Sequence, residues 1–174
     1  MDWIDSIISG VVSGVIASVV FFVMLLFVRP NLKVSEGMTS RMLNDGTLEI
    51  KIKIVNKTLS MLTNVSYSLY YCKEGKDGIH LIEELDPKKR PITSVSKYSF
   101  KKDNTDYAVR LTYNIDPDKY ILFDNTKFIF VIMCNHAVSN TTKCIQKEYR
   151  KEDVIQNGVF ETDKSMKILV TDVS

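Results

Sequence analysis

Clusters of basic residues are the groups in this sequence whose charge and spacing suit the binding of phosphate. Lysine and arginine side chains donate charge-assisted hydrogen bonds to phosphate oxygens, and tyrosine rings, of which the chain has eight, stack on nucleotide bases. The alternative is that these clusters are solvated loops or that they contact anionic lipid. The residues that we predict to bind a nucleotide or a short oligonucleotide are Lys88, Lys89, Arg90, Lys101, Lys102, Lys147 and Arg150.

Cysteine and histidine residues offer a second chemistry, that of a zinc site. Cys134 and His136 are two positions apart, Cys144 follows them, and Cys72 and His80 are further donors. Their spacing does not match the closely spaced cysteine pairs of structural zinc sites. We therefore predict no metal site and no other cofactor.

Catalytic motifs are absent from the sequence. It contains no P-loop, no G-x-S-x-G, no H-E-x-x-H and no kinase motif, and only two histidines are available as general bases. The formal net charge of +2 is also too small to indicate a nucleic-acid surface from the total alone. We predict that the protein is not an enzyme.

An uncharged segment near the N-terminus sets the architecture that must position these groups. Residues 6–28 are 23 residues without a charged side chain, which as an α-helix would extend about 34 Å and cross the roughly 30 Å hydrocarbon core of a bilayer. The residues before it are acidic, and it ends without a small-residue cleavage site, unlike a signal peptide. The sequence therefore predicts a retained transmembrane helix within residues 1–30.

Charges on either side of this segment predict its orientation. Arg29 and Lys33 follow it, whereas only Asp2, Asp5 and the terminal amine precede it, and basic residues near a span tend to remain in the cytoplasm. The odd number of cysteines, three, also suits a reducing compartment. We predict a single-pass protein of the cell inner membrane, with its N-terminus outside and residues 31–174 forming a cytoplasmic domain.

Three N-glycosylation sequons, at Asn56, Asn64 and Asn140, would instead suit an extracellular domain. A chain rich in asparagine, serine and threonine acquires such sequons by chance. We therefore give more weight to the flanking charges and to the cysteine count.

Small residues share one face of the predicted span. Ser6, Gly10, Gly14 and Ser18 recur every four residues, and Ser13 lies beside them. A G-x-x-x-G pair in such a face lets two helices approach closely, although glycine and serine are also simply common in spans. We predict a homo-oligomer whose spans pack along this small-residue stripe, with serines of the stripe lining a narrow pore.

The sequence after residue 30 has the two-residue period of β-strands. Alternating apolar and polar residues predict half-buried strands at 47–56, 62–72 and 107–115, and the apolar run 127–134 predicts a central strand covered on both faces. Short strands at this spacing predict an antiparallel β-sandwich or a small β-barrel. Weaker candidates for strands are residues 32–36, 79–85, 93–100, 142–149 and 166–171. One short helical turn is predicted at residues 151–156.

The layout of the chain resembles that of a known class of membrane proteins. One N-terminal span is followed, after a very short linker, by a β domain that carries VNKT at 55–58 and LTNV at 62–65. In this respect the chain is similar to the small membrane effectors of bacterial antiphage defence, such as the Hailong channel-type effector and the membrane effectors of CBASS and type III CRISPR systems. The resemblance implies a cytoplasmic domain that senses a nucleotide signal, and oligomerised spans that perturb the membrane.

Our leading prediction is therefore a homo-oligomeric membrane effector. Its cytoplasmic β domain would sense a nucleotide or an oligonucleotide, and its spans would form an ion channel or disrupt the bilayer. The alternative belongs to a different class of protein. It is a passive, membrane-anchored adaptor or accessory subunit, which recruits a protein partner encoded alongside it through an exposed sheet edge.

Overall fold

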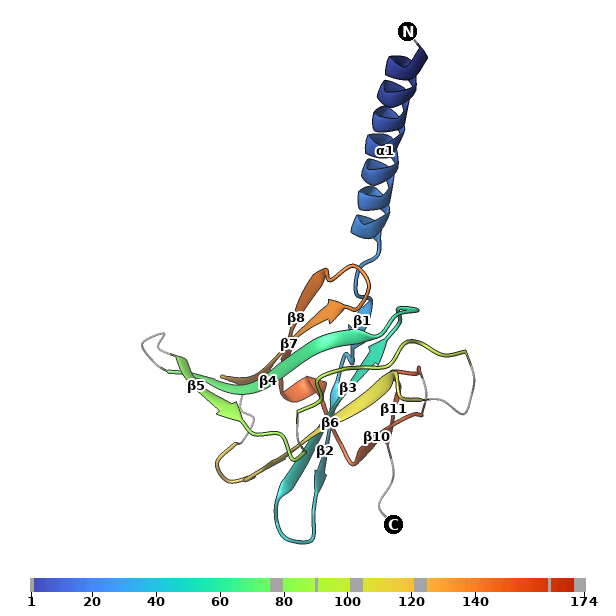
Figure 1. Cartoon of the computed structure of the whole chain (residues 1–174). Helices are drawn as coiled ribbons and strands as arrows, with labels where there is room; N and C mark the ends of the chain where they lie inside the picture. Colours follow the sequence, from blue (N-terminus) through green and yellow to red (C-terminus); the bar gives the residue numbers. More distant parts are fainter. Residues whose placement is uncertain are drawn as a thin grey trace.

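The computed structural model describes residues 2–75, 80–89, 91–100, 105–120, 125–162 and 164–170. A single helix, α1 (Asp2–Phe27), extends away from a β domain built of two sheets (Figure 1). Residues Trp3–Leu25 of this helix are long and apolar enough to cross a membrane, as predicted, and the helix is not buried against the β domain. The helix ends shortly before Pro30, whose ring disfavours the helical conformation in the residue that precedes it.

The first sheet is centred on β3 (Leu48–Asn56). One edge of β3 pairs antiparallel with β6 (Ala108–Ile115), and the other pairs with β1 (Leu32–Val34) and β2 (Met38–Met42) in succession. The outer edge of β2 pairs with β9 (Val154–Gln156) in the parallel direction. Strands from both ends of the β domain's sequence thus meet in one sheet.

The second sheet has the order β5-β4-β7-β8 and is antiparallel throughout. Its strands are β4 (Leu62–Glu74), β5 (His80–Leu85), β7 (Thr126–His136) and β8 (Thr142–Tyr149). The predicted segments 62–72, 79–85, 127–134 and 142–149 all correspond to these strands, within a few residues at each end. The two large sheets do not close into a barrel, so of the two predicted architectures the structure shows the sandwich.

The core lies between the two sheets and is made of the inward residues of alternating strands. Ile50, Ile52 and Ile54 of β3 face Phe130 and Ile132 of β7, and all five are 1% exposed or less. Each of these side chains contributes roughly 1.5–3 kcal/mol of apolar burial to folding. A two-sheet sandwich does not itself specify a function.

The outer face of the first sheet is covered, which the strand pattern did not predict. A small hairpin of β10 (Gly158–Phe160) and β11 (Ile168–Val170) packs against β2. The approach is so close that a Cβ atom on Gly158 would lie 3.0 Å from the Thr39 side chain of β2. As a result Lys53, expected on a solvated face, is only 1% exposed and donates hydrogen bonds to two backbone carbonyls, those of Glu161 (2.6 Å) and Ser165 (2.7 Å).

Two further predictions about strands were wrong. Segment 93–100 is not a strand: its backbone hydrogen-bonds to Leu62 and Val65 at the start of β4, but the strand pairing is limited to one isolated bridge, between Val95 and Leu62. The outer face of β7 is only partly covered, since Met133 is 45% exposed. The predicted helical turn at 151–156 is a 3-10 turn, η1 (Lys151–Asp153), that leads directly into β9.

One of the three sequons has a structural role. Asn56 is fully buried, and its side-chain amide donates hydrogen bonds of 2.9 Å to the carbonyls of Ser60 and Ser96. This side chain fixes the β3–β4 turn and is inaccessible to a glycosyltransferase in the folded protein. The VNKT sequence is thereby explained by local folding.

Candidate functional site

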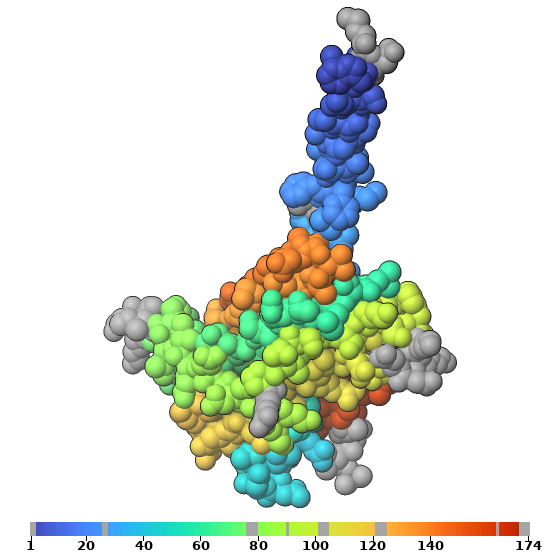
Figure 2. All heavy atoms as spheres, viewed as in Figure 1, coloured from blue at the N-terminus to red at the C-terminus, as the bar shows by residue number. Residues whose placement is uncertain are grey.

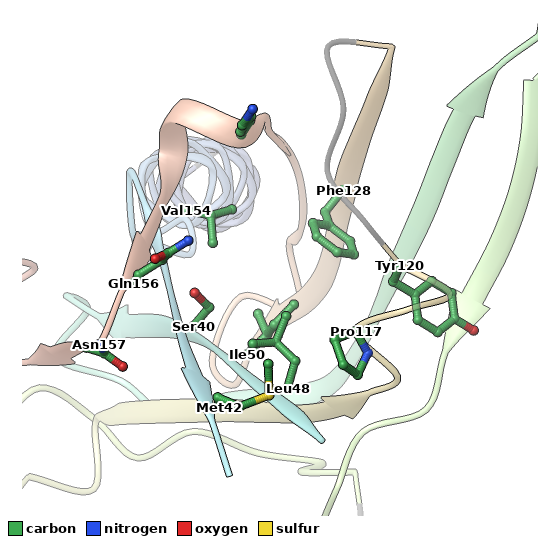
Figure 3. A pocket seen from close by; sticks show the side chains of 11 residues that line it. Ser40, Met42, Leu48, Ile50, Pro117, Tyr120, Phe128, Val154, Gln156 and Asn157 are labelled. Atoms are coloured by element: carbon green, nitrogen blue, oxygen red, sulfur yellow. The ribbon is translucent and has the colours of Figure 1, made fainter. Parts of the chain in front are cut away.

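A cavity of about 420 Å³ opens between the two sheets, at the end of the sandwich that lies away from the helix. Its volume is within the roughly 300–1,000 Å³ range of small-molecule sites. Figure 3 shows Tyr120 and Phe128 on one side of the cavity, with Ser40 and Gln156 across from them. Apolar side chains, among them the buried Ile50, form its floor.

Tyr120 is held in place by three interactions. Its hydroxyl donates a 2.8 Å hydrogen bond to Glu83, and its ring makes an edge-to-face contact with Tyr71 at 5.3 Å between centroids. The ammonium group of Lys119 lies 5.0 Å from the centre of the same ring. Hydrogen bonds from Lys119 and Tyr120 lower the pKa of Glu83, so this carboxylate remains ionised and accepts the hydrogen bond from the tyrosine hydroxyl.

Lys151 lines the cavity at the start of the η1 turn. The turn is stabilised by Asp153, whose carboxylate accepts a 2.9 Å hydrogen bond from the backbone N–H of Arg150. Among the described residues that line the cavity, Lys151 is the one that carries a positive charge. Aromatic walls, a few polar groups and one cation suit a flat ligand with an anionic end.

The basic residues predicted from the sequence do not form one site. Lys88 lies 3.4 Å from the carboxylate of Glu49, and Lys147 is ion-paired with Glu36. Burial acts to raise the pKa of Glu49, but hydrogen bonds and charge attraction from Lys51 and Lys88 outweigh it and lower that pKa. Both predicted lysines are therefore engaged by carboxylates within the protein.

Lys89 occupies a different place, a groove of about 470 Å³ on the first sheet. Arg110 and Lys53 also line this groove, but both donate hydrogen bonds to backbone carbonyls, that of Glu161 among them, and Asp106 adds a negative charge. The groove is polar and basic overall. Among the described residues that we predicted to bind phosphate, Lys89 is the one that lines this groove.

Arg150 lines a third and smaller hollow, of about 180 Å³, with Cys72, Glu74 and His80. The remaining predicted ligands, which lie outside the described residues, are Arg90, Lys101 and Lys102. The structure thus distributes the described basic residues over separate surfaces. None of the four predicted ligands that the structure describes, Lys88, Lys89, Lys147 and Arg150, lines the cavity between the sheets.

The residues that build the cavity were missed because they come from five separate segments. Tyr120 follows the Asp-Pro turn after β6, Phe128 is on β7, and Lys151 begins η1. Ser40 and Gln156 come together only because β2 and β9 pair in parallel. The sequence did contain one indication of this site, the basic pair Arg150 and Lys151 beside the predicted helical turn. Nothing in the sequence connected Lys151 to Tyr120.

The small-residue stripe of α1 is open in the protomer. A Cβ atom on Gly10 or on Gly14 would meet no atom within 4 Å. Ser18 donates a 2.8 Å hydrogen bond to the Gly14 carbonyl, so its hydroxyl is satisfied within the helix. Ser6 and Ser13 are exposed on the same face. The stripe is therefore sterically free to receive another helix.

Helix and sandwich are joined by hydrogen bonds as well as by the chain. The carbonyl of Val28 accepts hydrogen bonds from the Ser139 hydroxyl at 2.6 Å and the Thr141 hydroxyl at 3.1 Å, both in the β7–β8 turn. Three residues later, the carbonyl of Asn31 accepts a 2.8 Å bond from the N–H of Lys57. We call this group of contacts the junction.

His136 organises the β7–β8 turn that makes the junction. Its Nδ1 atom lies 3.3 Å from the backbone N–H groups of Val138 and Ser139 and accepts from both, which requires an unprotonated Nδ1. Burial lowers the pKa of this histidine. The neutral ring is thus the form that stabilises the turn.

We predict a pH dependence from His136. Because its pKa is lower in the folded than in the unfolded protein, the unfolding free energy falls as the pH drops below about 6.5, by at most about 1.4 kcal/mol per pH unit. Urea unfolding of the solubilised full-length protein between about pH 7 and 5.5 measures this slope. His136→Asn keeps a hydrogen-bond acceptor but does not titrate, so it should flatten the dependence of the unfolding free energy on pH. An unchanged slope in this variant would mean that another group causes the pH dependence.

Metal ligation has no support among the described residues, where no three histidine, cysteine or acidic side chains converge. The Cys72 thiol lies 3.9 Å from His80 Nδ1, while Cys134 and His136 are buried at the other end of the second sheet. Burial raises the pKa of Cys134, which keeps it as a thiol.

Comparison with known proteins adds no family. No protein-family model matches the sequence, and no curated protein matches it.

Proposed function

We propose that this protein is a self-associating membrane effector. In this proposal α1 spans the inner membrane and packs on copies of itself along the small-residue stripe. The sandwich lies in the cytoplasm and binds a small aromatic, anionic ligand of the nucleotide class in the cavity between its sheets. Ligand binding changes the packing of the spans, which form an ion channel or disrupt the bilayer. The architectural resemblance to antiphage effectors supports the same assignment.

The observation that carries the proposal is the physical continuity between the cavity and the span. Phe128 at the cavity and His136 at the junction belong to the same strand, β7, about 26 Å apart at 3.3 Å per residue. Strand β7 is hydrogen-bonded on both sides, to β4 and β8, and in this proposal it carries a displacement from the cavity to the β7–β8 turn. Ser139 then connects the end of β7 to the carbonyl of Val28.

Removal of the Tyr120 ring tests the ligand. Stacking on an aromatic side chain contributes about 1–3 kcal/mol per base, so Tyr120→Ala should weaken binding by about tenfold or more. The measurement is calorimetric titration of the solubilised full-length protein with ATP, a cyclic dinucleotide and a short oligoadenylate. Lys151→Gln should reduce both the affinity and its dependence on salt.

The matched control is Tyr70→Ala, since Tyr70 is a half-buried tyrosine that does not line the cavity. If Lys89→Gln weakens binding while Tyr120→Ala does not, the ligand binds in the basic groove and the assignment to the cavity is wrong. If none of the three probes binds, the nucleotide class itself is wrong.

The second candidate, an anchored adaptor, is favoured by an edge strand of the second sheet, which pairs on one side only among the described residues. Strand β5 lies at this edge, and its Leu81 and Ile82 side chains are 62% and 59% exposed. Such an edge can receive a strand from a partner. For an adaptor, Ile82→Lys should abolish cross-linking to that partner in cells, whereas changes in the small-residue stripe should have little effect.

A further inference from the structure

The end of the sandwich that surrounds the helix exit has an unusual charge. Three segments meet there: 28–34 at the linker, 57–62 at the β3–β4 turn and 137–143 at the β7–β8 turn. Together they carry four basic residues, Arg29, Lys33, Lys57 and Lys143, and no acidic residue. The whole chain, by contrast, is nearly balanced, with 23 basic and 21 acidic residues. Positive charge is therefore concentrated at this end.

The same end presents apolar side chains at the tips of its turns. Leu59 is 72% exposed, Met61 is 44% exposed and Val138 is 70% exposed. The two turns are in contact, since the N–H of Ala137 donates a 3.1 Å hydrogen bond to the Met61 carbonyl. Figure 2 shows the β7–β8 turn, in orange, directly below the helix. These side chains form an apolar patch that continues from the apolar helix.

We propose that this end of the sandwich docks on the bilayer, with Leu59, Met61 and Val138 in the interface and Lys33 and Lys57 bound to anionic lipid headgroups. The inference rests on the part of the proposed function in which α1 spans the membrane. It adds a lipid partner and fixes how the sandwich stands on the surface. We call the surface the docking end.

The short linker and the junction restrict the sandwich to this position. Only residues 28–31 separate α1 from β1, and two of their carbonyls, those of Val28 and Asn31, are hydrogen-bonded to the sandwich. A domain held in this way cannot turn a different face to the bilayer. Apolar side chains insert into the interfacial region of a bilayer, and lysines bind its anionic headgroups.

Among the residues that the structure describes, no carboxylate forms an ion pair with Lys33 or Lys57. Burial and then repulsion from the neighbouring ammonium groups of Lys33 and Lys164 lower the pKa of Lys57. A phosphate or carboxylate of a lipid headgroup placed between these lysines would replace repulsion by attraction.

The test measures lipid contact at both ends of the sandwich in the full-length protein. An environment-sensitive fluorophore is attached at Val138→Cys in a Cys144→Ser background, because Cys144 is the exposed native thiol. The protein is reconstituted in phosphatidylcholine vesicles with and without phosphatidylserine, and quenching by lipids with a shallow doxyl group is measured. The matched control carries the fluorophore at Asn44→Cys, in the β2–β3 turn at the end farthest from the helix (Figure 1).

We expect strong quenching at position 138 in anionic vesicles and none at position 44. Each lysine near an anionic surface favours binding roughly fivefold, so Lys33→Gln with Lys57→Gln should weaken docking by on the order of 20-fold. Equal quenching at both positions, or equal quenching at 138 in neutral and anionic vesicles, would overturn the proposal. A second copy covering Val138 would shift the emission without quenching by lipid, which also overturns it.

The single tryptophan, Trp3, separates failure of this inference from failure of the proposed function. Trp3 lies in α1, so doxyl lipids quench its emission only if the helix is inserted. Quenched Trp3 with an unquenched label at 138 would mean an anchored but undocked sandwich. Unquenched Trp3 would overturn both the docking and the span.

Discussion

Gly10→Leu combined with Gly14→Leu is expected to convert the protein to a monomer and to abolish its conductance. The measurements are size-exclusion chromatography with light scattering in a mild detergent, and current across planar bilayers. Close approach of two helices depends on van der Waals contact along a face without bulky side chains. Two leucines would fill that face, and the dissociation constant should rise at least tenfold, which is about 1.4 kcal/mol.

The structure makes this an unusually clean substitution. Because an added side chain at Gly10 or Gly14 meets no atom of the protomer, leucine creates no internal clash. Leucine is also a better helix former than glycine, by roughly 1 kcal/mol per residue in water, so the helix itself is not weakened. Any loss of association then comes from the interface between copies.

Val12→Leu is the matched control. Val12 is two residues from each glycine, so at 3.6 residues per turn it lies on the opposite face of α1 at the same depth. It should leave both the oligomer and the current unchanged. An oligomer that survives the double glycine change would mean that the stripe does not hold the copies together, and the adaptor would become the better account.

The fold of the β domain was largely predictable because alternation of side chains along a strand reports which face is buried. The segment 47–56 illustrates both the strength and the limit of that signal. Ile50, Ile52 and Ile54 are in the core as predicted, yet Lys53 on the other face is buried as well. Its cover, the β10–β11 hairpin, comes from more than a hundred residues later, and periodicity within one strand carries no information about it.

The candidate site was predicted less well, for a related reason. Basic clusters in the sequence are local, whereas a cavity in a sandwich is lined by residues that meet only through strand pairing. Lys88 and Lys147 are charged and close to turns, but Glu49 and Glu36 lie beside them in space. The ligand chemistry that they suggested, a cation with tyrosine, reappears at Lys151 and Tyr120, which no spacing rule would have joined.

Removal of the two junction hydroxyls, by Ser139→Ala with Thr141→Val, should uncouple the sandwich from the span. Each hydrogen bond to the Val28 carbonyl contributes about 1 kcal/mol, so the pair holds a coupling energy of about 2 kcal/mol, equivalent to roughly 30-fold. We expect ligand affinity and oligomeric state to remain as in the native protein. The change in bilayer current on adding ligand should fall by tenfold or more.

Thr142→Val provides the control for the junction, since the Thr142 hydroxyl donates its hydrogen bond to Asn135 in the same hairpin rather than to Val28. It should leave the ligand response intact. A double variant that still responds to ligand would show that the signal does not pass through Val28. A variant that loses ligand affinity too would mean that β7 has shifted along its length, and calorimetry beside the current measurement distinguishes the two. The difference matters because only an uncoupled protein, still able to bind and to assemble, identifies the junction as the point where sensing becomes membrane activity.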